Sequence, residues 1–570
     1  MSVGSADARE SERASGGRRW CALILLLSLL VNMIGLQWGL PNDNQTWAAD
    51  ALQPLTPMSV GRHVLFGERW NSGWFYFKYP LGHPLLLLAA QAPYLAWLRA
   101  TGQLGRPAST YPYGFKQPER ALARLALTTR AVSALMGVGT VGLAYVIGTS
   151  LFGVSAGLVS ALLVAGCYPL VFYAHTSNVD APLLFWIALA LAAALRSAER
   201  DSRAAALLAG GAMAMALLTK EQSIGALAAV PPVWLLQRRA RQTTRRALQH
   251  AVAALAGFAA VTFVIGNVWW NPAGYVNRWR FLLGVLPAAI REKYAPYQFL
   301  VQVPQGFSLA HEWQHVGKVA GMITQALTPP VMVLSLAGLA LALWRRPRSG
   351  VVLLVLGALY YLLSLRALEL VPVRYTMPVL FAFLLAGGAM GGVILDWIGA
   401  APSAGRRRAL SAAVVLALLG TLLPGVEVVH LLRRDPRYAA EAWLRANAGA
   451  NARVEVYQPM TYLPRFTSEA QVTRVPVPER TIEAFQQRHP DLVVLSGGGR
   501  AGLTGRYAKD WRPGQPIFAD SDQATQFFDA LRGERLGYQR AAQFRTPTRW
   551  ITPRINSVNP EITIFTPSKR

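Results

Sequence analysis

Six side chains of this sequence have the types needed for acid–base and phosphate chemistry. They are the carboxylates Asp43, Asp50 and Asp180 and the cations Lys78, Lys220 and Arg374. A carboxylate can take a proton from an acceptor hydroxyl as a general base. Cationic side chains can hold a phosphate and stabilise it as a leaving group. The six residues are spread over positions 43 to 374, so this chemistry depends on the elements that bring them together.

The composition is typical of a membrane protein. Of the 570 residues, 53% are hydrophobic and only 15% are charged, and the mean hydropathy is +0.28. A soluble chain carries about 25% charged residues. Apolar runs of 18 or more residues recur along the chain, as in helices that span a bilayer. We therefore predict an all-α polytopic membrane protein that is embedded in a lipid bilayer.

The formal charge of +27 raises the question of a nucleic-acid partner. Many of the arginines, however, lie in short clusters between apolar runs, as membrane topology demands. No basic stripe with interleaved aromatic residues appears, and we expect no nucleic-acid partner. The two cysteines, Cys21 and Cys167, both fall inside predicted spans and imply no disulfide framework.

The arginine clusters predict the topology. Residues 1–19 form a polar tail that we expect to be disordered and cytoplasmic. The apolar run at 20–38 lacks a small-residue cleavage site and is predicted to be a retained anchor. Four later clusters lie in short loops and should be cytoplasmic by the positive-inside bias. They are Arg196/Arg200/Arg203, Arg238/Arg239/Arg241/Arg245/Arg246, Arg345/Arg346/Arg348 and Arg406/Arg407/Arg408. Pairs of apolar runs separate these clusters, so the chain returns to the same side each time.

One apolar run must fail to cross, because an odd number of crossings is needed between residue 38 outside and Arg196 inside. We exclude 81–98, which Pro84 and Pro93 interrupt, and expect it to lie at the outer interface. The prediction is then about eleven transmembrane helices. They are 20–38, 128–149, 155–174, 180–195, 204–220, 222–237, 248–269, 318–344, 351–368, 376–398 and 409–431.

This topology gathers the reactive side chains on the outer face. The predicted transmembrane domain is 20–432, with a large first outer loop at 39–127. Residues 433–570 alternate strands and helices, as a small α/β domain would. Carboxylates at membrane depth tend to face a bundle interior or a water-filled cavity. Acids and cations at one interface predict transfer of a group from a lipid phosphate. Purely structural roles stay open: a helix cap for Asp180, a turn for Asp43 and snorkelling for the cations.

Five short motifs, in order, resemble the GT-C membrane glycosyltransferases. They are WAAD followed by Pro54, then FKYPLGHP, YAHTSNVDAPLLFW, LLTKE and RYTMP. The sequence is most similar to the dolichyl-phosphate-mannose-protein mannosyltransferase-like group, which includes the aminoarabinose transferases (glycosyltransferase families 39 and 83), over about residues 20–400. The resemblance implies a polyprenyl-phosphate sugar donor and an inverting transfer on the outer face.

The resemblance also implies roles for particular residues. Asp50 matches the family's general base better than Asp43 does, and Asp180 matches a second acid in the next outer loop. Lys78 and Tyr79 match the family's phosphate contacts. Beyond what the resemblance implies, we expect Asp180 to act in catalysis by orienting the acceptor or helping to hold the base. The predicted contacts to the donor phosphate are Lys78, Tyr79, Lys220, Arg374 and Tyr375, and the predicted substrate contacts are Asp43, His83, His175, Asn178 and Glu221. Relatives often have Asp-Glu where this chain has Asp50 followed by Ala51. The case for a metal held by paired acids is therefore weaker, and the need for a divalent metal stays open.

Three rival hypotheses come from other motifs. HEWQH, from His311 to His315, fits the zinc-binding pattern H-E-x-x-H and predicts an integral-membrane metalloprotease as the alternative. Gly497, Gly499 and Gly502 have dinucleotide-site spacing, but Pro513 breaks the helix that such a site would need. A lipid or sugar transporter is the third hypothesis, although no internal repeat supports it.

The expected location is a bacterial plasma (inner) membrane, crossed several times. The N-terminus is then cytoplasmic and the C-terminal domain extracytoplasmic. The acceptor would be a hydroxyl of a protein, a lipid or a polysaccharide.

Overall fold

The structure is a computed structural model, and it describes most of the chain. The described residues are 3–42, 46–48, 51–67, 69, 79–238, 243–283, 285, 308–368, 371–400, 403–467, 469–497, 522–551, 555 and 557–568. The chain divides into two compact units. Unit 1 comprises 1–36, 51–100 and 128–426, and unit 2 comprises 37–50, 101–127 and 427–570. Two pieces of the first predicted outer loop thus belong to the same unit as the C-terminal residues.

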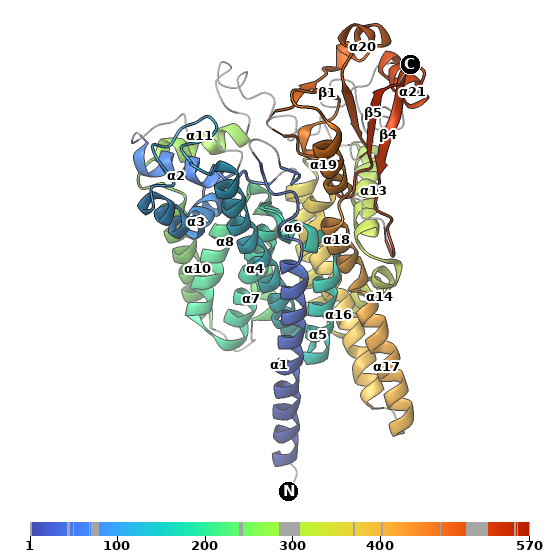
Figure 1. Ribbon diagram of the computed structural model, residues 1–570. Helices are drawn as coiled ribbons and strands as arrows, with labels where there is room; N and C mark the ends of the chain where they lie inside the picture. The colour runs from blue at the N-terminus through green and yellow to red at the C-terminus, as the bar shows by residue number, and fades with distance from the viewer. Residues whose placement is uncertain are drawn as a thin grey trace. The chain divides into compact units, whose positions relative to one another are not determined.

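Unit 1 is helical, and Figure 1 labels most of its helices. Its helices are α1 (Val3–Met33), α2 (Thr56–Phe66), α3 (Gly82–Ala100), α4 (Pro118–Phe152), α5 (Val154–Gly166), α6 (Tyr168–Ala174), α7 (Asp180–Arg200), α8 (Arg203–Thr219), α9 (Ile224–Gln237), α10 (Thr244–Ile265), α11 (Pro272–Leu282), α13 (Leu309–Ala326), α14 (Pro329–Arg345), α15 (Pro347–Tyr360), α16 (Met377–Gly399), α17 (Ala404–Gly420) and α18 (Leu423–Arg433). Helix α4 begins, and α18 ends, in unit 2. Three short elements join them: η2 (Glu221–Ser223), the π-helix η3 (Tyr361–Leu365) and η4 (Val373–Thr376).

The structure confirms a polytopic helical membrane protein, but with fewer long spans than the eleven expected. Among the described residues, seven helices are long and apolar enough to cross a bilayer, or nine if each of two bent pairs is one span. The run expected as one span at 318–344 is bent by 118° between α13 and α14. The backbone of Thr328 is extended at this bend, because the ring of the following proline disfavours helical geometry in the residue before it. The run at 155–174 is bent by 63° at Cys167, and α8 has only 17 residues.

Helix α3 corresponds to the run that we excluded as a span. It has 19 residues with Pro93 in its interior, and it is not among the candidate spans of the described residues. Its position at the outer interface stays a prediction.

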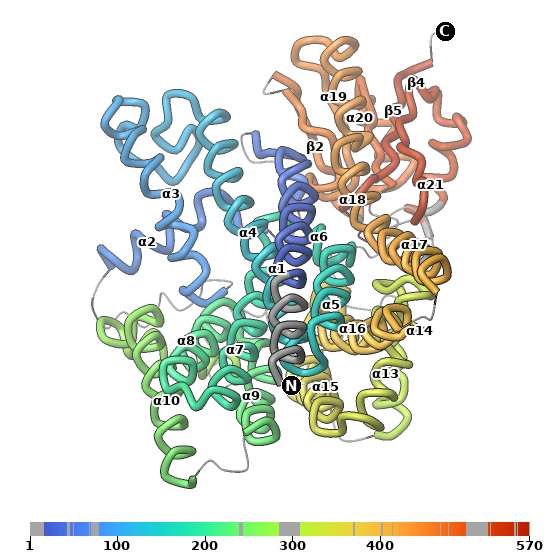
Figure 2. The backbone as a smooth tube through the Cα atoms, turned by 90° about the horizontal axis from the view of Figure 1, so that it is seen from below, coloured from blue at the N-terminus to red at the C-terminus, as the bar shows by residue number. Residues whose placement is uncertain are grey.

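Close helix pairs hold unit 1 together. Figure 2 shows α8 beside α10 and α5 beside α16, and both pairs are in contact. A methyl group at Gly210 of α8 would lie 1.7 Å from the carbonyl oxygen of Ala254, and one at Gly388 of α16 would lie 1.9 Å from Oγ of Ser160. Small residues allow helix backbones to approach closely, which supplies the van der Waals contact that favours packing in a membrane.

Unit 2 contains a mixed five-stranded sheet with the strand order β2-β1-β3-β5-β4. The strands are β1 (Arg453–Val456), β2 (Gln471–Arg474), β3 (Leu492–Ser496), β4 (Tyr538–Phe544) and β5 (Ile562–Pro567). Strand β1 pairs in parallel with β2 and β3, whereas β5 is antiparallel to both β3 and β4.

Helices cover both faces of this sheet, and strand β3 is therefore buried on both sides. Val493 and Leu495 pack with the phenylalanines of α20 (Ile482–Arg488) and α21 (Asp522–Arg532). Leu492 and Val494 pack with α19 (Pro436–Asn447). Successive residues of a strand point to opposite faces, so the two clusters are separate cores. The α/β character expected for the C-terminal residues is confirmed.

Candidate active site

The first site residue, Asp180, begins helix α7 and is only 3% exposed. Its backbone N–H donates to Oδ1 of Asn178 at 2.7 Å, which shapes the turn before the helix. The carboxylate lies in the first turn, where the helix dipole favours a negative charge. It makes no side-chain cap of α7. The capping role that the sequence left open for this carboxylate is therefore not the one that the structure displays.

Two cations from other elements approach the Asp180 carboxylate. Lys220 follows the last residue of α8, and its Nζ lies 2.6 Å from Oδ1 of Asp180. Arg374 lies in η4, and its Nε is 3.7 Å from Oδ2. The loops that end α8 and precede α16 thus bring both cations to the first turn of α7. The sequence placed all three on one face, and the structure brings them together.

The aromatic ring of Tyr375 lies beneath both cations. Nζ of Lys220 is 4.0 Å from the ring centroid, and Cζ of Arg374 is 4.9 Å from it. Both distances are within the range of cation–π attraction, which stabilises positive charge in a place poor in water. Two cations thus converge on one carboxylate in a place that is mostly buried. Such a cluster is suited to bind an anion such as a phosphate.

The backbone that follows Asp50 is fixed beside this cluster. The N–H of Leu52 donates to the carbonyl oxygen of Ser177 at 2.9 Å, three residues before Asp180. The Leu52 side chain packs with Val179 and with Leu87 of α3. Asp43, Asp50 and Lys78 themselves lie outside the described residues.

A second ion pair lies next along the chain. Glu221 of η2 accepts from Nε of Arg278 in α11, and both side chains are at least four-fifths buried. The pair lines a pocket with Tyr79, Tyr275 and Trp279. Tyr79 and Glu221 were expected site residues, but Arg278 and the two aromatics were not. The stretch GYVNRWRF at 274–281 carries the signal, because it places arginines between aromatic residues in a predicted outer loop.

Part of the sequence matches the model of a known protein family. Residues 124–270 match the family model described as dolichyl-phosphate-mannose-protein mannosyltransferase. That match confirms the resemblance. The matched stretch begins in α4 and contains Asp180, Lys220 and Glu221 of the site, so the mannosyltransferase-like pattern coincides with its central elements. No curated protein matches the sequence.

Several solved structures are also similar. The oligosaccharyltransferase AglB from Archaeoglobus fulgidus, in complex with an inhibitory peptide and a dolichol-phosphate, has 13% identity and a TM-score of 0.41, covering 85% of this chain and 70% of that one. ArnT from Cupriavidus metallidurans bound to undecaprenyl phosphate has 14% identity and a TM-score of 0.38, covering 96% and 98%. The Saccharomyces cerevisiae Pmt1–Pmt2 complex has 16% identity and a TM-score of 0.31, covering 51% and 37%.

His83 is the expected substrate residue with the most unusual surroundings. It is completely buried, and neither ring nitrogen has a hydrogen-bond partner among the residues that the structure describes. Residues four apart share a helix face, so His83 lies on the same face of α3 as Leu87. That face also carries Gln91, whose Nε2 donates to the carbonyl oxygen of Pro54 at 3.0 Å. His83 therefore belongs to the face that packs on the segment after Asp50.

His175 has a structural environment instead. One ring nitrogen lies 2.7 Å from the carbonyl oxygen of Val171 and the other 2.8 Å from that of Ile34. Both nitrogens are thereby occupied by backbone groups at the end of α1 and in α6. Its expected substrate contact stays a prediction that would require this arrangement to change.

Two side chains of the HEWQH motif, His315 and Glu312, make hydrogen bonds or an ion pair with other residues of the protein. Nε2 of His315 lies 2.8 Å from the carbonyl oxygen of Leu368, and Nδ1 lies 3.2 Å from the hydroxyl of Tyr361. Nε of Arg366 donates to Glu312 at 2.7 Å. A metal ligand needs a free ring nitrogen, and His315 offers none in this arrangement. Within the described residues, no group of three or more His, Cys, Asp or Glu is placed to hold a metal ion.

The glycine motif is only partly described. Gly497 directly follows β3, whereas Gly499 and Gly502 lie outside the described residues.

Proposed function

We propose that this protein transfers a sugar from a polyprenyl-phosphate donor to a hydroxyl of a protein, lipid or polysaccharide acceptor. The observation that carries the proposal is the buried cluster of Asp180, Lys220 and Arg374 on the ring of Tyr375. Two cationic side chains that converge at one place can hold a phosphate group by charge-assisted hydrogen bonds. The match of 124–270 to a mannosyltransferase family model supports the sugar as the group that moves.

The reaction needs one base and one stabilised leaving group. Asp50 accepts the proton of the acceptor hydroxyl, whose oxygen forms the new bond to the anomeric carbon. The bond between that carbon and the phosphate oxygen breaks on the opposite face of the sugar, so the configuration inverts. Polyprenyl phosphate leaves with the electron pair. Lys220 and Arg374, with Lys78 as a further candidate, hold the phosphate and offset its growing charge.

Asp180 has a supporting role in this mechanism. Its two carboxylate oxygens face Lys220 and Arg374, which fixes both cations in one place. Because both oxygens of Asp180 face these cations, we assign the proton transfer to Asp50 and not to Asp180. The pocket of Tyr79, Tyr275, Trp279 and the Glu221–Arg278 pair is the candidate place for the sugar or the adjoining lipid phosphate. We place the reaction on the extracytoplasmic side of the plasma membrane.

The test uses purified protein in detergent with a panel of polyprenyl-phosphate sugars. Release of polyprenyl phosphate is measured for the wild type, Asp50→Asn, Asp43→Asn and His311→Ala. We expect at least about 100-fold slower release from Asp50→Asn only, in line with the contribution of a general base. If Asp43→Asn is the inactive variant instead, the base assignment moves to Asp43. Hydrolysis of peptides that is lost in His311→Ala, with no donor turned over, would replace the transferase by the protease.

A further inference from the structure

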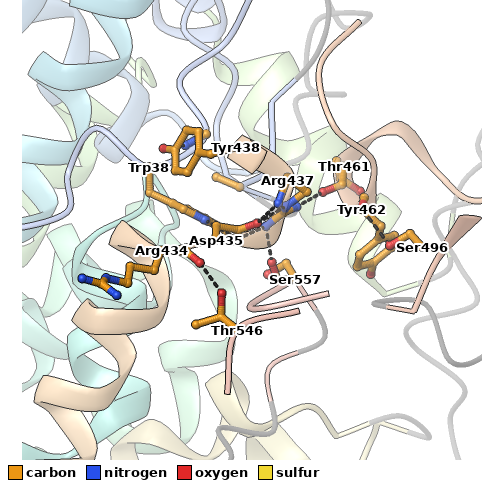
Figure 3. A network of polar contacts seen from close by, with 12 residues as sticks. Trp38, Arg434, Asp435, Arg437, Tyr438, Thr461, Tyr462, Ser496, Thr546 and Ser557 are labelled. Atoms are coloured by element: carbon orange, nitrogen blue, oxygen red, sulfur yellow. Dashed lines mark hydrogen bonds and ion pairs between the residues drawn. The ribbon is translucent and has the colours of Figure 1, made fainter. Parts of the chain in front are cut away.

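A completely buried ion pair lies at the start of α19 in unit 2. Nη2 of Arg437 is 2.6 Å from Oδ2 of Asp435, and both side chains are 0% exposed. The remaining guanidinium donors reach the carbonyl oxygens of Thr461 and Ser557, each at 2.7 Å. Figure 3 shows Arg437 between these partners. Buried ion pairs add little net stability over an apolar replacement, so this pair invites another explanation.

The pair also holds the segment that leads into the first outer loop. Nε1 of Trp38 donates to Oδ2 of Asp435 at 2.8 Å. The ring of Trp47 lies 4.2 Å from Cζ of Arg437 and 4.9 Å from Cζ of Arg465. The indole ring of Trp47 is itself 0% exposed. The indoles of Trp38 and Trp47 are thus held by a hydrogen bond to Asp435 and by contacts with the guanidinium groups of Arg437 and Arg465.

Further contacts fix the backbone of the same segment. Nη1 of Arg465 donates to the carbonyl oxygen of Leu40 at 2.8 Å, while its Nε and Nη2 bond to both oxygens of Glu441. The N–H of Gly39 donates to the hydroxyl of Tyr438 at 3.1 Å. The segment is therefore held by its rings and by its main chain. The ion pair between Arg465 and Glu441 holds the Arg465 guanidinium in the position from which it contacts Leu40.

We propose that Arg437, Arg465 and Trp47 form a positioning clamp for the catalytic loop, by which we mean residues 43–50. Unit 2 then has a role in catalysis beyond its own folding. This inference rests on the proposed function. Trp47 is three residues before Asp50 in the sequence, and the loop of 43–50 holds both candidate bases. A general base must lie within hydrogen-bond reach of its proton. A displacement of about 1 Å can slow a reaction about 100-fold. The clamp acts through the loop and touches no reacting atom.

The test compares two variants of one residue. Trp47→Leu removes the aromatic face, and Trp47→Phe keeps it. We expect Trp47→Leu to lower kcat for polyprenyl-phosphate release about tenfold or more while the donor KM stays within about twofold. Trp47→Phe should stay within about threefold of wild type because a phenyl ring still attracts a guanidinium. Arg465→Lys is the milder second variant: it keeps the charge opposite Glu441 but loses the planar donor set.

Arg480→Met is the matched control. Arg480 is 5% exposed in unit 2 and donates to the carbonyl oxygens of Tyr457 and Val475, away from 38–48. It should lower the stability of the unit and leave kcat unchanged. A loss of kcat in Arg480→Met equal to that of Trp47→Leu would overturn the clamp, because general weakening of unit 2 would then explain both.

A labelling experiment separates the clamp from the proposed function. Ala48 is 2% exposed, and both native cysteines are buried. In an Ala48→Cys background, we expect a maleimide to react at least about tenfold faster when Trp47 is changed to Leu, because loss of the indole lowers the free energy of the local opening that exposes the thiol. The same slow rate in both proteins would overturn the clamp. That result does not depend on sugar transfer, so it is informative even if no donor is turned over.

Discussion

Nζ of Lys220 lies 2.6 Å from Oδ1 of Asp180, and the two side chains are only 8% and 2% exposed. Asp180 begins helix α7 and Lys220 directly follows helix α8, so the contact joins the N-terminal end of α7 to the C-terminal end of α8. Breaking one side of a buried pair leaves an uncompensated charge, which costs far more than the pair contributes. The contact therefore has consequences for both folding and the proposed reaction.

We predict that Lys220→Met abolishes transfer and lowers the free energy of unfolding by about 3–5 kcal/mol. Lys220→Arg keeps a cation opposite Asp180 and should retain most of the stability. Thermal unfolding in detergent and release of polyprenyl phosphate measure the two effects. Arg408→Met serves as the control, since Arg408 is an exposed residue of α17. Full activity of Lys220→Met would remove this lysine from the phosphate site.

The HEWQH motif should prove structural. His315→Ala removes a donor to the carbonyl oxygen of Leu368, and an unsatisfied buried carbonyl costs about 1–3 kcal/mol. His311→Ala should leave both stability and sugar transfer near wild type, since transfer is proposed to occur at Asp50 and the Asp180 cluster.

Zinc removal gives the complementary measurement. We expect a zinc-selective chelator to leave the rate of polyprenyl-phosphate release unchanged. Loss of a peptidase activity on chelation, restored by added zinc, would contradict the structural role of the motif.

Gly39 should not tolerate a side chain. Its φ is +50°, and an added Cβ would lie 2.5 Å from Cβ of Trp47. Gly39→Ala is expected to destabilise unit 2 by about 2–4 kcal/mol, the sum of left-handed strain and overpacking. Gly102→Ala is the matched control, because Gly102 has φ +65° in the same unit with nothing within 4 Å of the added atom. Equal losses in both variants would show that the backbone conformation alone matters.

Asp491 should make unit 2 sensitive to acid. A hydrogen bond from the backbone N–H of Arg453 lowers the pKa of this carboxyl below its usual 3.8; burial opposes the shift, and the Arg453 side chain adds to it. The unfolded chain then takes up the proton first as the pH falls. The stabilising contribution is present above about pH 4 and is lost as the pH falls through the lowered folded-state pKa.

The variant Asp491→Asn measures this contribution. It should melt at a lower temperature than wild type at pH 7, and the difference should shrink at pH 3. A difference that stays the same at both pH values would mean that the charge of Asp491 is not its source.

Much of unit 1 could be predicted from the sequence because hydropathy and arginine clusters are local signals. Asp180, Lys220 and Arg374 were placed on one face by counting spans, and they do meet. The break between α13 and α14 was missed, although Thr328 before Pro329 and Pro330 was a visible signal. The hydropathy of 318–344 outweighed that signal in the prediction.

Contacts between distant segments could not be predicted in the same way. Nothing local to Trp47 indicates Arg437, and nothing local to Glu221 indicates Arg278. A tryptophan near a membrane is ordinarily expected to anchor in the interface. Trp47 instead packs beneath two guanidinium groups, which only the fold of unit 2 reveals.

The hydrogen bond from Trp38 to Asp435 joins residues 397 positions apart. At a synthesis rate of about 5–20 residues per second, Trp38 is added to the chain roughly 20–80 s before Asp435. Helices α2 to α18 are made during this interval, while the loop that begins at Trp38 lacks its partner Asp435. Unit 2 can be assembled only after its residues from 427 onward have been made. A nascent chain released before residue 435 would therefore carry the helices of unit 1 without the contacts that fix its first loop.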